Sequence, residues 1–283
     1  MNMRREMLLN AISQALQTLF PLIVLAVGSR NLSAEIFTDL ATFTYVYALL
    51  ITVVGFGFEV PLVKKFVEAK ESITKLSLLY SLLVVAQFIL LLICSIFIFF
   101  GISFVSIELD ILIFALVAAF FFAICPPWLI MILGLNKNNV IFSIFIRGMG
   151  IFLIFMFNWT SYNQLIGLLT ITFCLTNAFG FIQLRSFGLR FSSITSSSQW
   201  HNLVRLFKDS AGIFTARVSA STYTTMIPLT VTQVADPILA QAFIVADKLR
   251  NILQYGIGAL IPVFNRFYLS TMKNKNPLKK AYL

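Results

Sequence analysis

The chain has 283 residues, of which 59% are hydrophobic and 11% are charged. Soluble domains are about 45–50% apolar and about 25% charged, so this composition excludes an ordinary soluble globule. The formal net charge is +10, but the basic residues lie at the ends of apolar runs and not on a polar module, which argues against nucleic acid as a partner.

Eight apolar runs, taken in chain order, predict an all-α polytopic bundle of transmembrane helices. A helix of about 20 residues crosses the roughly 30 Å hydrocarbon core, and the runs lack the alternation of apolar and polar residues that barrel strands require. The predicted spans are Leu8–Gly28, Phe37–Gly57, Ser77–Phe100, Ile111–Gly134, Val140–Phe157, Leu165–Leu184, Ala211–Gln233 and Ile238–Val263.

Two connections are longer than the others, namely Phe58–Leu76 and the serine-rich stretch 185–210. The second one suggests a boundary between two lobes. We therefore divide the chain into an N-terminal six-helix transmembrane lobe (1–190), a cytoplasmic connection (191–210), and the first two helices of a second lobe with a basic tail (211–283).

The distribution of Lys and Arg predicts the orientation of the bundle, because cytoplasmic segments of membrane proteins are enriched in basic residues. With the N-terminus inside, every basic residue outside the predicted spans falls on the inner side except Arg30. We therefore expect both termini to lie in the cytoplasm.

Polar side chains recur on single faces of three predicted spans. The spacing of residues on a helix places the members of each set on one side. The sets are Asn10, Gln14, Gln17 and Pro21 in the first span, Arg217, Ser221, Thr224 and Pro228 in the seventh, and Gln241, Lys248, Asn251 and Tyr255 in the eighth. Three such faces predict a shared water-filled cavity, although the stripe of the first span is also compatible with packing between helices.

Ionisable residues at membrane depth mark candidate sites. Asp247 lies three residues before Arg250, close enough for an ion pair along the helix, which is also compatible with a purely structural role. Arg217, Lys248 and Arg250 against Asp247 give the predicted cavity a net charge of +2, which favours an anionic ligand such as a phosphate or diphosphate. Arg147, in the fifth span, either joins this cavity or extends toward lipid headgroups.

Signatures of catalysis are scarce in this sequence. It has one histidine, His201, in the serine-rich connection, and it has no HExxH, no CxxC and no glycine loop for phosphate. We therefore expect a transporter and not an enzyme, with no catalytic residues, no metal site and no cofactor.

Five patches, in this order along the chain, are similar to motifs of one family. They are Gly28-Ser29-Arg30-Asn31-Leu32, Gly55-Phe56-Gly57-Phe58, Pro127-Trp128 with Gly134 and Arg147, Tyr223 with Pro228, and Ala246-Asp247-Lys248-Leu249. The chain resembles bacterial polysaccharide flippases, the Wzx-type exporters of O-antigen and capsule repeat units, whose superfamily includes lipid II flippases and multidrug and toxin extruders. It departs from their pattern where Gly55 replaces an acid and Leu133 replaces a glutamine.

The resemblance implies a MATE-like fold of two six-helix lobes with a central cavity in the bacterial inner membrane. It implies a polyprenyl-diphosphate-linked oligosaccharide as the substrate, with membrane lipids, a polysaccharide polymerase and other assembly proteins as partners. The residues expected to bind the substrate are Arg217, Lys248, Arg250, Asp247, Arg147, Arg30, Gln14 and Asn251. Because such proteins have about twelve or more helices, we expect this chain to be truncated at its C-terminal side.

Two other functions remain open from the sequence. A cation-coupled drug extruder would share the fold, but it would favour a buried carboxylate in the first span, which carries only Asn and Gln. A truncated remnant or membrane scaffold that transports nothing is the other alternative.

Overall fold

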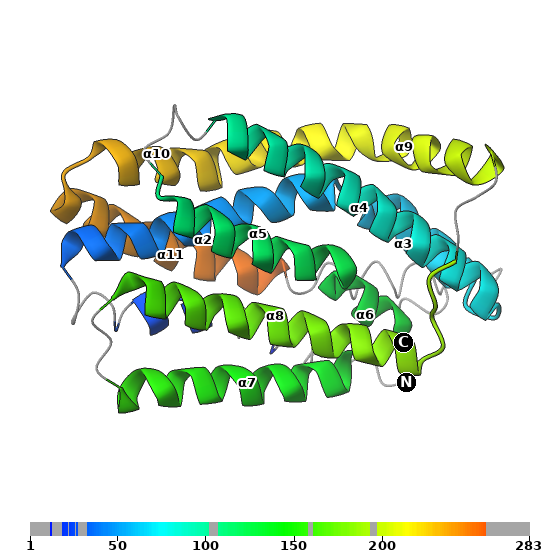
Figure 1. Ribbon diagram of the computed structural model, residues 1–283, viewed down its shortest axis with the longest axis horizontal. Coiled ribbons are helices and arrows are strands. Elements are labelled where there is room, and N and C mark those ends of the chain that lie inside the picture. The colour runs from blue at the N-terminus through cyan, green and yellow to red at the C-terminus, as the bar shows by residue number, and fades with distance from the viewer. Residues whose placement is uncertain are drawn as a thin grey trace, which may run out of the picture.

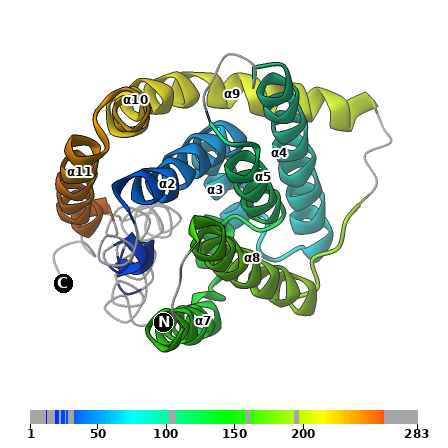
Figure 2. The ribbon, with the colours of Figure 1, turned by 60° about the vertical axis from the view of Figure 1, so that its left-hand side comes forward.

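The computed structural model describes residues 33–101, 107–157, 161–192 and 197–258, together with residues 12, 19–21, 23–25 and 27. These residues are almost entirely helical and include no strand, which confirms the all-α prediction. The helices lie roughly along one another in an elongated bundle (Figure 1). Viewed from the side, α2 lies near the centre, with α4, α5, α8, α9, α10 and α11 around it (Figure 2).

The helices match the order of the predicted spans. They are α2 (Ala34–Gly55), α3 (Glu59–Glu68), α4 (Ile73–Gly101), α5 (Leu109–Ile124), α6 (Pro127–Leu133), α7 (Asn136–Met156), α8 (Tyr162–Ser186), α9 (Ser197–Ser221), α10 (Ile227–Val234) and α11 (Pro237–Gly258). A π-helical turn, Thr222–Met226, joins α9 to α10.

Five segments of the described chain are long and apolar enough to cross a membrane. They are Phe37–Gly55, Ile73–Phe99, Leu109–Leu133, Lys137–Met156 and Asn163–Ser186, and they correspond to the second to sixth predicted spans. The first predicted span lies mostly outside the described residues. The described parts of the last two predicted spans are helical but more polar, since α11 alone carries Asp247, Lys248 and Arg250 within four positions.

Small residues allow α2 and α5 to approach closely. Ala115, Ala119 and Ala123 follow one another at intervals of four along α5, and all three are fully buried. They belong to the same apolar cluster as Leu40 and Val54 of α2. Close contact through small side chains is the usual way to pack helices in lipid, where the hydrophobic effect gives no driving force between helices. The result is a firmly packed α2, which can position side chains on its other faces.

The fourth predicted span, Ile111–Gly134, is not one continuous helix. It breaks at Cys125 and Pro126, because Pro126 and Pro127 have no N–H to continue the ladder of hydrogen bonds. The hydroxyl of Tyr80 donates to the freed carbonyl oxygen of Ile124 at 2.9 Å. An unpaired carbonyl at membrane depth would be costly, so Tyr80 makes this break tolerable.

The segment Phe58–Leu76, predicted as a connection, contains the amphipathic helix α3. A tight turn precedes it, in which Phe56 and Gly57 have φ angles of +46° and +72°. This turn points the Phe56 ring at α9, where it stacks on Phe214 with the ring centroids 4.2 Å apart. The turn therefore attaches the end of α2 to α9.

The seventh predicted span also begins earlier than expected. Helix α9 begins at Ser197 rather than Ala211, so much of the predicted connection 191–210 is helical. Leu203 and Leu206 on this added part are buried in the second apolar cluster of the molecule, and Phe207 packs against that cluster. Their burial explains the extension of the helix beyond the apolar run.

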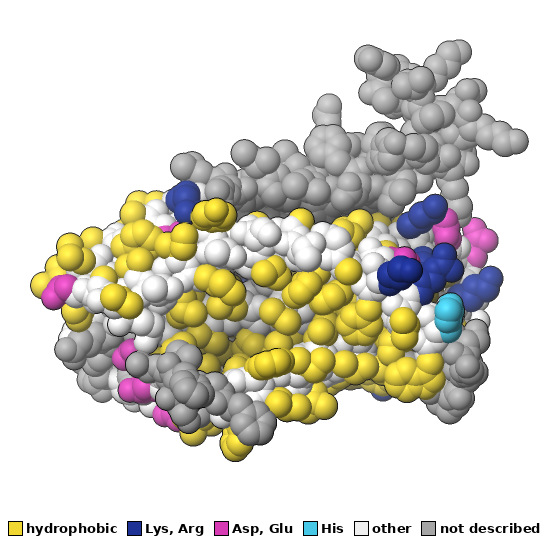
Figure 3. All heavy atoms as spheres, turned by 90° about the horizontal axis from the view of Figure 1, so that it is seen from above, with side chains coloured by type: hydrophobic (Ala, Val, Ile, Leu, Met, Phe, Trp, Pro, Cys, Tyr) yellow, Lys and Arg dark blue, Asp and Glu magenta, His cyan; other side chains and the backbone are white. Residues whose placement is uncertain are grey.

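Charged residues are divided between the two ends of the bundle. The Arg190 N–H donates to Ser77 at 3.2 Å, which places the basic end of α8 beside the start of α4. At the opposite end, Asn163 donates to Asp110 at 3.3 Å. In Figure 3, most of the visible Lys and Arg side chains and the His side chain gather at the right-hand end together with some acidic side chains, other acidic side chains lie at the left-hand end, and apolar side chains lie between the two ends. This pattern suits a helical bundle across a membrane.

We expect Gly57→Ala to destabilise the protein. A left-handed backbone costs a non-glycine residue about 1–2 kcal/mol, and the added Cβ would lie 2.6 Å from Cγ2 of Ile213. The measurement is thermal unfolding of the purified protein in detergent. The control is Gly148→Ala on α7, where a Cβ meets nothing within 4 Å and helix propensity improves. Equal melting temperatures for the two variants would contradict the tight packing of this turn on α9.

Candidate functional site

The structure places the predicted site residues on three helices. Arg147 lies on α7 and Arg217 on α9. Asp247, Lys248 and Arg250 lie near the middle of α11. Gln14 and Arg30 lie outside the described residues, and the side chain of Asn251 does not belong to the described part either.

The inward face of α9 and α10 is largely as predicted, with one change. Arg217 is half-buried and Ser221 and Pro228 are buried, but Thr225 and not Thr224 takes the position between them. The π-helical turn causes this shift, because the Ile227 N–H bonds back five residues to the Thr222 carbonyl. Such turns add one residue to a helix, and the missing N–H of Pro228 favours one here.

Asp247 is the most buried of the charged residues on α11. It is 5% exposed, and its Oδ1 accepts a hydrogen bond from Nη2 of Arg250 at 2.6 Å. This confirms the ion pair predicted from the spacing. A second donor was missed, namely the hydroxyl of Tyr45 on α2, which donates to Oδ2 at 3.0 Å. Its signal in the sequence is the polar stripe of Thr38, Thr42 and Tyr45 on one face of an apolar helix.

Lys248 also depends on α2 for its partners. Its Nζ donates to Oγ1 of Thr44 at 3.1 Å and lies 4.2 Å from the centroid of the Tyr45 ring. A cation over an aromatic face is stabilised by the ring quadrupole. Among the described residues, no carboxylate lies within salt-bridge distance of Lys248. Its charge is therefore solvated by a hydroxyl and a ring and is not neutralised by a direct ion pair.

Arg217 has a partner that the sequence analysis did not foresee. Its Nη2 forms an ion pair with Oε1 of Glu59, at the start of α3. The predicted count of three cations against one carboxylate is therefore wrong for the described residues. With Glu59 included, three cations face two carboxylates, and the net charge is +3 − 2 = +1. The site remains cationic but less so than predicted.

The structure separates the cations into two groups and does not gather them in one cavity. Glu59, the partner of Arg217, lies beyond the end of α2, whereas Tyr45 lies at its middle. Ten residues separate Tyr45 from Gly55, which is about 15 Å along a helix. We name the two groups the end site (Glu59 and Arg217) and the middle site (Tyr45, Asp247, Lys248 and Arg250).

Arg147 lies apart from both groups. It is 3% exposed, close to the Tyr47 ring, which stacks on Phe173 of α8 at 4.8 Å between centroids. The side chain is thus buried among helices and does not extend to the surface. Within the described part of the chain, its Nε and Nη1 have no hydrogen-bond partner. Arg147 is a buried cation on another side of α2 from Lys248.

The comparisons with known proteins gave one match. A family model described as "Polysaccharide biosynthesis protein" matches residues 3–267, which includes every helix named above. No curated protein and no solved structure matches the chain.

We expect Tyr45→Phe to destabilise the middle site. A buried carboxylate that loses a hydrogen-bond donor costs about 1–3 kcal/mol, and the phenyl ring keeps the packing of Tyr45 otherwise unchanged. Thermal unfolding in lipid nanodiscs measures the effect. The matched control is Tyr223→Phe, which removes a hydroxyl from a side chain that is 70% exposed and should change little. If Tyr45→Phe unfolds like the wild type, the hydroxyl is not important to Asp247.

Proposed function

This chain belongs to the polysaccharide biosynthesis protein family, and from that premise we propose that it is a flippase for a lipid-linked oligosaccharide. Its several long apolar helices make it a multi-pass membrane protein. The proposed substrate is a polyprenyl-diphosphate-linked repeat unit of O-antigen or capsule. The proposed location is the bacterial inner membrane, and the proposed activity is movement of the substrate between leaflets without covalent chemistry.

The observation that carries this proposal is that Lys248 has no ion-pair partner among the described residues. Lys248 lies in the middle of α11, beside the buried Asp247 that already pairs with Arg250. A cation at membrane depth costs about 2.5–3.5 kcal/mol on insertion scales. Thr44 and Tyr45 offset part of that cost, and the diphosphate of the substrate would offset more. A cation kept at this depth is therefore suited to an anion that passes through the membrane.

The end site, where the charges of Glu59 and Arg217 cancel, and the middle site, which has a net charge of +1, suggest the path of the headgroup. The end site lies beside the turn after α2, near the basic end of the bundle, and the middle site lies about 15 Å along α2 from the end of that helix. We propose that the diphosphate first contacts Arg217, whose planar guanidinium can bind two phosphate oxygens, and then reaches Lys248. Glu59 and Asp247 hold the two arginines in position when no substrate is bound.

The arrangement of helices in the membrane is part of the proposal. We propose eight spans, with both termini in the cytoplasm, in a MATE-like lobe of six helices joined to the first two helices of a second lobe. The gathering of basic side chains at one end supports this orientation, since the segment around the turn between α3 and α4 carries Lys64, Lys65, Lys70 and Lys75 and would face the cytoplasm. The Phe56 turn and the ion pair between Glu59 and Arg217 would then join the two lobes on the cytoplasmic side.

We expect Lys248→Ala to lower transport about tenfold or more. A hydrogen bond to a charged group is worth about 1.5–3 kcal/mol, and about 1.4 kcal/mol is a factor of ten. The assay is surface polysaccharide in cells that depend on this protein, with its abundance measured in parallel. Lys248→Arg should retain part of the activity because the charge survives.

The matched control is Lys137→Ala, on the exposed start of α7. It should transport normally, because it removes an exposed lysine that belongs to neither site. Normal transport by both Lys248→Ala and Arg217→Ala, at normal abundance, would show that the cationic mechanism is wrong. A change in drug resistance with no change in surface polysaccharide would support the drug extruder instead.

Reporter fusions test the proposed topology. Fusions after Lys70 should report the cytoplasm, and fusions after Glu108 or Asp236 should report the outside, because basic residues surround the first site and acidic residues the other two. Phosphatase and fluorescent-protein reporters give opposite signals and serve as controls for each other. Two reversed reporters would contradict the eight-span arrangement.

A further inference from the structure

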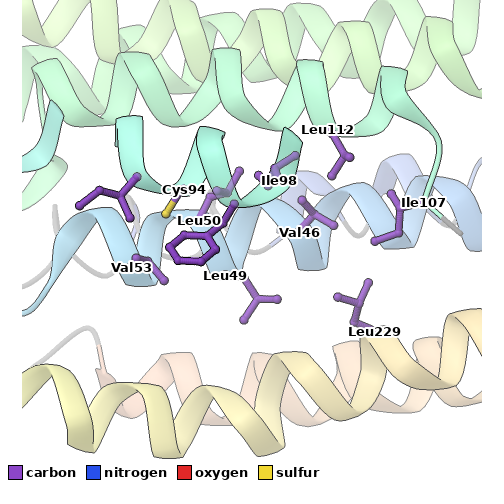
Figure 4. A pocket seen from close by; sticks show the side chains of 11 residues that line it. Val46, Leu49, Leu50, Val53, Cys94, Ile98, Ile107, Leu112 and Leu229 are labelled. Carbon is purple, nitrogen blue, oxygen red and sulfur yellow. The ribbon is translucent and has the colours of Figure 1, made fainter. Parts of the chain in front are cut away.

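An apolar groove lies between α2, α4, α5 and α10. It has a volume of about 520 Å³, which is within the range of sites for small molecules, about 300–1,000 Å³. Its lining side chains carry no charge, and they include Val46, Leu49 and Leu50 of α2, Cys94 and Ile98 of α4, and Leu229 of α10. Figure 4 shows the residues of α2 following one another along that helix, with Leu229 on the other side of the space.

The groove opens to the surroundings of the bundle. Ile93 and Phe97 belong to its lining and are 42% and 74% exposed. They continue into the exposed apolar surface of α4, where Leu92 and Phe99 are 63% and 76% exposed. At the depth of these helices the surroundings are hydrocarbon, so the chemistry of an occupant is that of a hydrocarbon chain.

The position of the groove relative to the middle site indicates which kind of lipid has a hydrocarbon chain suited to the groove. On α2, Val46 follows Tyr45 directly, and Tyr45 holds Asp247. On α10, Leu229 lies one helical turn from Thr232, whose hydroxyl is 3.1 Å from that of Thr42. The groove and the middle site are thus neighbours along α2, and the hydrogen bond between Thr42 and Thr232 joins α2 to α10 beside them.

An ordinary phospholipid could place an acyl chain in the groove but would leave the middle site without a ligand. Its headgroup stays at the membrane surface, whereas the charged residues next to the groove lie at the middle of α2 and α11. A lipid with its headgroup at that depth is one in transit between leaflets.

The contact between Thr42 and Thr232 is weak. It consists of neutral hydrogen bonds, including one from the Gln233 amide, which is 3.4 Å from Thr42, and each contributes only about 0.5–1.5 kcal/mol to stability.

We propose that this groove binds the isoprenoid chain of the lipid-linked substrate while its diphosphate contacts the middle site. The inference rests on the proposed function and adds a second site to it, on the side of α2 and α10 away from Lys248. Parting of Thr42 from Thr232 would join the groove to the middle site, so that one molecule could occupy both.

The test is photo-crosslinking of the wild-type protein in phospholipid nanodiscs with a polyprenyl phosphate that carries a diazirine on its chain. Mass spectrometry locates the labelled residues. We expect labels on 46–53, 93–98 and Leu229, and we expect unlabelled polyprenyl phosphate to suppress them while excess phosphatidylethanolamine does not. Equal labelling by a diazirine on a phospholipid acyl chain, or labels spread evenly over Leu92 and Phe99, would overturn the proposal, because bulk lipid would then be the occupant.

A matched pair of variants gives a second readout. Leu49→Trp fills the groove and should reduce labelling several-fold, whereas Leu92→Trp, exposed on α4 outside the groove, should not. Comparable labelling of the two variants would also overturn the proposal. Thermal unfolding shows whether each is folded, and the mapping on the wild type stands without them.

Surface polysaccharide separates this proposal from the function on which it rests. If the protein exports polysaccharide but the isoprenoid probe shows no preference for the groove, the proposed isoprenoid site is wrong and the flippase function stands. If the probe concentrates in the groove but the protein exports no polysaccharide, the isoprenoid site stands and the flippase function is wrong.

Discussion

Burial of charge between helices is the constraint that arranges α2 and α11. An ionised side chain there has to find its partners within the protein. Asp247 is almost fully buried, and it receives hydrogen bonds from Arg250 of its own helix and from Tyr45 of α2. Lys248, the next residue, uses Thr44 and the same tyrosine ring. A single turn of α2 therefore supports the charged part of α11, and that turn is held in place by the alanines of α5 on its opposite side.

Local features of the sequence predicted most of the helices and one ion pair. Long apolar runs form helices in lipid because the backbone N–H and C=O groups have no water to bond and must pair within the segment. This requirement predicted α2, α4, α7 and α8. The pair between Asp247 and Arg250 follows from a spacing of three on one helix. The break at Pro126 also has a local cause, but the carbonyl group that it frees is hydrogen-bonded by Tyr80, which comes from a different helix.

The rest of the site depends on contacts between distant segments. Glu59 and Arg217 are 158 positions apart, and they meet because the left-handed turn at Phe56 and Gly57 directs α3 toward α9. The turn falls within the last residues of the predicted span Phe37–Gly57 and helix α3 lies outside every predicted span, so periodicity could not reveal them. The π-helical turn before Pro228 likewise rotates the buried face of α10, and a prediction that assumes an ideal α-helix cannot include this rotation. The apolar groove arises from four helices together, and a run of apolar residues along α2 does not distinguish a groove from a core.

The dependence of α11 on Tyr45 has a consequence for the order in which the protein is made. In the proposed eight-span arrangement, α11 enters the membrane with three charged residues within four positions, each of which opposes entry by about 2.5–3.5 kcal/mol on insertion scales. Their partners on α2 leave the ribosome some 200 residues earlier. Stable integration of α11 therefore requires that α2 already be inserted and still have its polar face uncovered. The polar stripe of α2 acts during biogenesis as a receptor for a helix that could not enter the bilayer stably by itself.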